Sequence, residues 1–124
     1  MNIISESQQF KDSSKYLRDF SKLSDIIEQD GYLLLRSLID LNSVLRVKHD
    51  IMSILREHHI IEKEHLEEPM WSGGPHPTEK EYMRIYDKVV RLASFNALAD
   101  SPNIISLAEG ITGDTMRCWT QRLF

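Results

Sequence analysis

The stretch EQDGYLLLRSLIDLNSVLRVKHDIMSIL, residues 28–55, decides how this chain can fold. A helical pattern ends at Gly31, because glycine readily takes the left-handed conformation that closes a helix. Residues 32–35 are continuously apolar and too few for a helix, so they predict a short strand that is buried on both faces. Asp40 then suits the N-cap of a longer helix. The stretch therefore predicts one short strand set between two helices.

The first half of the chain predicts helices on both sides of residues 32–35. One is expected within residues 6–20, and another from about Ser21 to the stop at Gly31. The long helix after Asp40 carries apolar residues at helical spacing, and we expect that face to lie in the core. Its members are Leu41, Val44, Leu45, Ile51, Ile54 and Leu55.

The second half of the chain holds signals for two more helices and one strand. Thr78 and Glu81 form a Thr-x-x-Glu capping box, which predicts the start of a helix. The apolar side of that helix, expected in the core, consists of Tyr82, Ile85, Tyr86, Val89 and Leu92. Pro102 suits the first position of another helix, which is expected to end at Gly110. Residues 115–124 alternate in the way that a strand does.

Composition limits the kind of protein this can be. The 124 residues carry a net charge of −4 and their basic residues are scattered, so no nucleic-acid partner is expected. No apolar run approaches the roughly 20 residues that span a bilayer, and the N-terminus lacks a signal-peptide pattern. The single cysteine, Cys118, is expected to be an inert thiol in a reducing compartment. We therefore expect a soluble, cytoplasmic protein without a membrane partner.

Two segments carry a resemblance to a known family. They are DGYLLLRSLID at residues 30–40 and SPNIISLAEGITGDTMRCWTQRLF at residues 101–124. Through them, residues 20–124 resemble the N-terminal portion of the phytanoyl-CoA dioxygenase family, whose members are Fe(II)- and 2-oxoglutarate-dependent oxygenases. The resemblance implies an α+β fold, with N-terminal helices and the first strands of a double-stranded β-helix of jelly-roll type. Those strands are expected near residues 32–35 and 115–124.

The resemblance also implies that residues 1–124 form a single partial domain. One strand near each end cannot make a stable sheet, so the sheet is expected to be incomplete in this chain. Self-association, or a completing polypeptide, is then expected at residues 115–124, because an open apolar edge recruits other chains. A non-enzymatic alternative stays open, in which a helical domain binds a partner through the face between residues 41 and 55.

The activity that the resemblance implies is oxidation, by hydroxylation, of a small-molecule substrate with Fe(II) and 2-oxoglutarate as cofactors. The family holds its iron with a His-x-Asp pair and a distant histidine, and it binds 2-oxoglutarate with a nearby Arg or Lys. Residues 1–124 contain no His-x-Asp pair, so no catalytic residue and no metal ligand is expected in this chain. The chain alone is therefore expected to be inactive, with neither cofactor bound. The substrate, and the choice between hydroxylation and halogenation, stay open.

Three residues are expected near the ligands of the complete enzyme on the same resemblance. Gln121 is placed toward 2-oxoglutarate, where its amide could donate a hydrogen bond, and Trp119 on the same strand face is placed toward the substrate. Trp71 lies in a long loop, residues 58–77, that is expected to cover the mouth of the active site. The alternatives are that Gln121 faces solvent and that Trp71 only pins the loop to the core.

Two histidine patterns could belong to a metal site. His65 and Glu67 form a His-x-Glu pair, but it precedes the helix that starts at Thr78, whereas the family's pair follows the strand expected at residues 115–124; a chance match is the simpler interpretation. If the long helix continued past residue 57, then His58, Glu62 and His65 would share one face and would suit zinc. A solvated polar face near the end of a helix is the interpretation that we prefer for this set.

Overall fold

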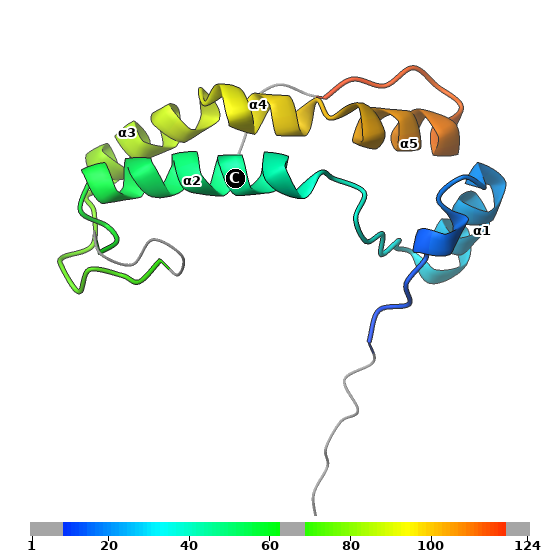
Figure 1. Cartoon of the computed structure of the whole chain (residues 1–124), viewed down its shortest axis with the longest axis horizontal. Helices are drawn as coiled ribbons and strands as arrows, with labels where there is room; N and C mark the ends of the chain where they lie inside the picture. Colours follow the sequence, from blue (N-terminus) through cyan, green and yellow to red (C-terminus); the bar gives the residue numbers. More distant parts are fainter. Residues whose placement is uncertain (1–8, 63–68, 119–124) are drawn as a thin grey trace, which may run out of the picture.

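The computed structural model describes residues 9–62 and 69–118, and these residues form a helical structure. The elements in chain order are a short 3-10 helix, η1 (Ser14–Tyr16), and five α-helices: α1 (Phe20–Asp30), α2 (Leu41–Glu57), α3 (Glu79–Val90), α4 (Ala93–Ala99) and α5 (Pro102–Thr112). Figure 1 shows α3, α4 and α5 following one another in a row. Helix α2 lies against α3 and α4, whereas α1 packs on α5 (Figure 1).

The α+β fold that the resemblance implied is wrong for the described residues. They form two isolated β-bridges, between Asp12 and Leu34 and between Ile61 and Trp71, but no sheet. The backbone N–H of Ser13 donates to the carbonyl of Leu34 at 2.9 Å. Residues 32–35 are only partly buried beside it, so the strand expected there is reduced to one bridge. A lone pair of short extended segments is too small to persist as a sheet, which explains the difference.

The strand expected at residues 115–124 is not present in the part of it that is described. Residues 115–118 have no regular secondary structure, and residues 119–124 lie outside the described ranges. The backbone N–H of Met116 donates instead to the side chain of Glu109 at 3.0 Å. A local hydrogen bond to the preceding helix therefore takes the place of a strand pairing for this residue.

Helices α1 and α2 begin and end for the reasons that the sequence suggests. The side chain of Asp19 accepts a hydrogen bond from the N–H of Lys22 and caps α1. The helix therefore begins at Phe20, one residue before the expected start at Ser21. Gly31, at φ 77°, ends the helix and confirms the predicted stop. Asp40 caps α2 by accepting from the N–H of Ser43 at 2.9 Å, as predicted.

Helix α3 has the predicted start, but it ends earlier than expected. Both hydrogen bonds of the Thr78–Glu81 capping box are present. The chain then leaves the helix after Val90, and a separate helix, α4, follows from Ala93. The side-chain amide of Asn96 donates to the carbonyls of Val90 and Leu92 at 3.0 and 2.9 Å, so it satisfies carbonyls left open by the break. Helix α4 is not among the helices predicted from the sequence.

Two other predicted helix boundaries are wrong. Helix α5 runs through Gly110 to Thr112, and Gly113, at φ 75°, closes it. A β-carbon placed on Gly110 would come 2.6 Å from the ring of Phe20, so this glycine allows the close approach of α1 and α5. The helix expected within residues 6–20 is reduced to η1 among the described residues, which exclude 1–8.

The buried core lies mainly between α2 and α3. Ile54, Ile85 and Val89 form a buried cluster, with partly buried apolar residues around it. Those neighbours are Ile51, Leu55, Ile60 and Leu92. The predicted apolar side of α3 is thus confirmed at Ile85 and Val89. It is wrong at Tyr82, which is exposed at the start of the helix.

Candidate functional site

The candidate site is an apolar face on the N-terminal half of α2. The exposed fractions of Leu41, Val44 and Leu45 are 67%, 39% and 48%. The expectation that these residues lie in the core is therefore wrong, although their helical spacing was read correctly. We call these three residues the open face of α2. Apolar side chains clustered on one helix face and left in solvent are the usual mark of a surface that contacts another structure.

The open face continues a stripe that is buried further along the helix. Leu41, Leu45 and Met52 lie at positions i, i+4 and i+11, which places them on one side of α2. Met52 is only 5% exposed. Figure 1 shows the chain after α2 folding back beneath the C-terminal end of the helix, away from its N-terminal half. The same stripe is thus covered at one end and uncovered at the other.

The contact between α2 and α4 explains why the open face is not buried. The side of α2 that faces α4 is polar: Asp50 accepts a hydrogen bond from the hydroxyl of Ser94 at 2.6 Å. This bond, followed by one from His49, lowers the pKa of Asp50, so its carboxylate stays charged. A cavity of about 440 Å³ lies beside this pair, and Arg46 also lines it. A polar contact therefore holds α4 at Asp50, whereas Leu41 and Leu45 lie on roughly the opposite side of α2.

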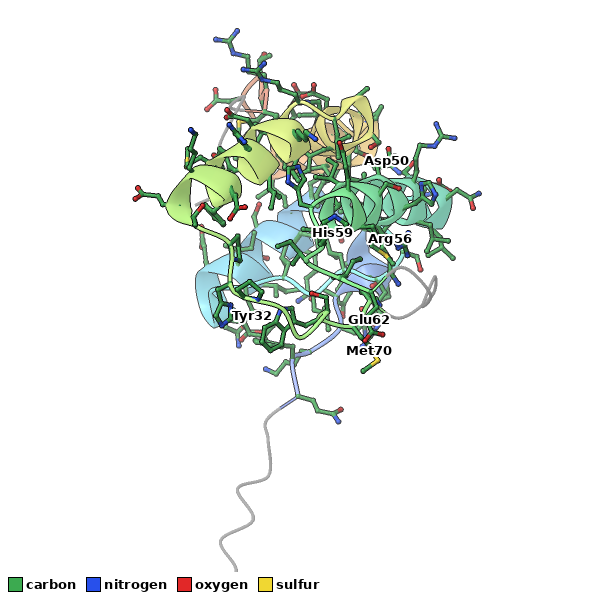
Figure 2. The ribbon with its side chains drawn as sticks, turned by 90° about the vertical axis from the view of Figure 1, so that its left-hand side faces the viewer. Tyr32, Asp50, Arg56, His59, Glu62 and Met70 are labelled. Carbon is green, nitrogen blue, oxygen red and sulfur yellow. The ribbon has the colours of Figure 1, made fainter. Side chains whose placement is uncertain are left out.

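Residues 59–62 and 69–72 lie side by side, and Trp71 belongs to the second of these segments. The N–H of Glu62 donates to the carbonyl of Met70 at 2.9 Å, and the two residues are labelled next to each other in Figure 2, below Arg56. The hydroxyl of Ser72 donates to the carbonyl of His59, which has an unusual φ of 58°. These bonds fix the two segments without burying the tryptophan.

Trp71 is 56% exposed, so it does not pin the loop into the core as one alternative supposed. Its indole stacks on the ring of His76, with ring centres 5.3 Å apart and planes 9° from parallel. The expectation that it meets a substrate stays a prediction. The companion residues Trp119 and Gln121 lie outside the described residues, and Cys118, just before them, is partly buried.

The helical zinc face considered from the sequence does not form. Helix α2 ends at Glu57 and His58 is its C-cap, so His58 and Glu62 do not continue the helix. His65 and the His65–Glu67 pair lie outside the described residues. Within residues 9–62 and 69–118, no three His, Cys, Asp or Glu side chains are arranged to hold a metal ion. The described residues therefore do not fit an iron or zinc site.

Sequence reasoning missed a histidine-lined cavity at the C-terminal end of α2. It has a volume of about 230 Å³ and is lined by His58, His59, His76 and Glu81, among others. The Nε2 atom of His58 is buried and has no hydrogen-bond partner. The sequence does place three histidines near the two ends of one loop. The contact between Ser72 and His59 brings these ends together, and residue spacing alone does not predict that contact.

Comparison with known proteins adds no assignment. A comparison with protein-family models found no match, and comparisons with curated proteins and with solved structures found none either. Among the helices that the structure describes, none is both long enough and apolar enough to cross a membrane.

Proposed function

We propose that this chain is the helical N-terminal portion of an Fe(II)- and 2-oxoglutarate-dependent oxygenase of the phytanoyl-CoA dioxygenase type. In this proposal, the open face of α2 docks the helices onto the catalytic part of the enzyme. The single observation that carries it is the exposure of Leu41, Val44 and Leu45. They lie on the helix that follows DGYLLLRSLID, and the resemblance implies that this helix packs on the outside of the catalytic part.

Physical chemistry supports docking at this face. Fully burying one leucine or valine side chain contributes roughly 1.5–3 kcal/mol, and the open face holds three such residues that are partly covered, so each would contribute a part of that amount. Their contribution is enough to position a helix when further contacts accompany it. Burial among described apolar residues is correspondingly limited: seven are buried, while ten large ones are exposed. The described residues therefore expose apolar surface that a partner could bury.

The catalytic residues of the proposed enzyme are assigned outside this chain. The sequence has no His-x-Asp pair, and the described residues do not fit a metal. Fe(II) and 2-oxoglutarate would supply the oxidation of a small organic substrate in the catalytic part. The role of residues 1–124 in this proposal is structural, since α2 fixes the helices on that part.

The test begins with the coding sequence after codon 124. The proposal requires a His-x-Asp or His-x-Glu pair there, followed by a distant histidine and an arginine. The whole encoded protein is then assayed for succinate release from 2-oxoglutarate, with iron, ascorbate and candidate substrates. We expect the double variant Leu41→Asp/Leu45→Asp to lose soluble protein and turnover, whereas Ser53→Asp, an exposed change on the same helix, keeps both.

Two results would contradict this proposal. One is a coding sequence without the expected histidines. The other is a double variant that folds and turns over as well as the control. The first result favours a second candidate function, in which a non-enzymatic helical domain binds a partner through the open face. That candidate rests on the same exposure, since an apolar helix face also suits a groove on another protein.

A further inference from the structure

A cavity of about 430 Å³ lies where α1 and α5 meet the turn before α2. Four of its eight lining residues are apolar and four are polar. The residues that matter are Leu17, Phe20, Leu38 and Leu107 on the walls, with Arg18 and Ser106. This volume and this mixture are typical of sites for small molecules, in which an apolar wall holds the body and a few polar groups orient it.

The walls of this cavity are fixed by specific contacts. The ring of Phe20 lies directly on the backbone of Gly110, where any β-carbon would meet it at 2.6 Å. The side-chain amide of Asn103 donates to the carbonyl of Leu38 at 3.0 Å. These two contacts tie α1 and the turn to α5. The cavity is therefore formed before any ligand arrives, which lowers the cost of binding.

The turn at the cavity is also strained. Ser37 has φ 58°, a left-handed conformation that residues other than glycine rarely adopt. Such strain persists only where the surrounding structure enforces it, and it clusters at binding sites. Here it places Ser37 and Leu38 on the cavity wall.

Arg18 sets the chemistry of the ligand. Its guanidinium makes no hydrogen bond or ion pair within the described ranges. Guanidinium groups pair with carboxylates through two parallel hydrogen bonds. We propose that this cavity binds a small molecule that has an apolar body and one carboxylate. The site is separate from the open face of α2 and does not depend on the oxygenase proposal.

The test uses three probes on the whole chain: octanoate, 1-octanol and acetate. Binding is followed by chemical shifts of backbone amides in a titration. We expect octanoate to bind most tightly, with shifts centred on the residues that line the cavity, because it alone has both the body and the charge. Arg18→Gln should weaken octanoate about tenfold, the equivalent of one charge-assisted hydrogen bond, and leave 1-octanol unchanged. Arg91→Gln, the same change on an exposed residue after α3, is the control.

A second variant tests the cavity itself. Ser106→Phe places a ring in the space, so octanoate binding should be lost while the unfolding midpoint stays near that of the wild type. If this variant does not fold, the Arg18→Gln result still decides. The proposal is overturned if octanoate causes no saturable shifts at the cavity. It is also overturned if Arg18→Gln and Arg91→Gln bind octanoate equally well.

Discussion

The two ends of α2 carry apolar residues with different surroundings. In the C-terminal half, Ile54 is 8% exposed and packs against Ile85 and Val89 of α3. Near the N-terminus, Leu41 and Leu45 are 67% and 48% exposed and lie on roughly the opposite side of the helix from Ile54, whereas Val47 is buried. The difference teaches that apolar spacing defines which side of a helix can be buried. It does not define whether this chain supplies the cover.

Ile54 is covered because α3 packs on its side of α2, whereas Leu41 and Leu45 lie on another side of the helix. Helix α3 presents isoleucine and valine to α2, so the contact is apolar. Helix α4 presents Ser94 and small residues, and its bond to Asp50 is polar. Within residues 9–62 and 69–118, Leu41 and Leu45 stay exposed, and this exposure is the physical basis of the docking proposal.

The largest effect on stability is expected when a buried side chain is truncated in the C-terminal half of α2. We expect Ile54→Ala to lower the free energy of unfolding by ~2–5 kcal/mol, because it leaves a cavity among well-packed neighbours. Denaturant unfolding followed by circular dichroism measures the change. A loss below about 0.5 kcal/mol would mean that the C-terminal half is as open as the other half.

A smaller effect on stability is expected at the contact between α1 and α5, which depends on Gly110 having no side chain. Gly110→Ala should cost about 1–2 kcal/mol, because the new methyl group must displace the ring of Phe20. The better helix propensity of alanine offsets part of this cost. Thermal unfolding of the single variant and of Gly110→Ala/Phe20→Leu tests the cause, since the smaller side chain should restore stability. A single variant more stable than the wild type would contradict the close contact.

The helix that covers the C-terminal half can be weakened at its start. Thr78→Ala removes the capping box of α3 and should cost about 1 kcal/mol. Thr78→Ser, which keeps the hydroxyl, is the matched control and should lose much less. Hydrogen exchange would locate the effect. Faster exchange is expected in α3 and in its partner half of α2, and an effect spread evenly over the chain would argue against the division.

A smaller effect on the same helix depends on pH. Hydrogen bonds from the backbone N–H and hydroxyl of Thr78 lower the pKa of Glu81 below its ordinary 4.5. The stability that this carboxylate adds is therefore complete above pH 4.5 and is lost as the pH falls through the lower pKa of the folded state. Unfolding measured across that range should show a shallower loss in Glu81→Gln than in the wild type. Equal slopes would mean that the capping box does not bind the charged form preferentially.

Much of the helical architecture was predictable, since its signals are local. Asp40, Gly31 and the Thr78–Glu81 box act within a few residues of the ends that they define. The end of α5 was wrongly predicted at Gly110, because this glycine serves the contact with Phe20, which is far away in the sequence. The break before α4 was missed for a related reason, as Asn96 stabilises it by reaching back to the previous turn. The sheet expected from the resemblance failed because residues 32–35 find only one bridge partner.

The candidate site was predictable only as a pattern. The spacing of Leu41 and Leu45 marked an apolar side, and the partner-binding alternative named the helix that carries it. Which half is open depends on what α3 and α4 present, and no local signal reports that. The cavity beside Phe20 was invisible to the sequence for the same reason, since its walls come from segments far apart in the chain.

The most direct test of the open face is the unfolding free energy of Leu45→Ala in this chain. The residue is 48% exposed, so the substitution should change the unfolding free energy by no more than about 0.5 kcal/mol, which is the range of surface changes. Measured beside Ile54→Ala under the same conditions, it compares the two halves of one helix. A loss of about 2 kcal/mol or more for Leu45→Ala would show that the chain covers this face itself, and would contradict the docking proposal.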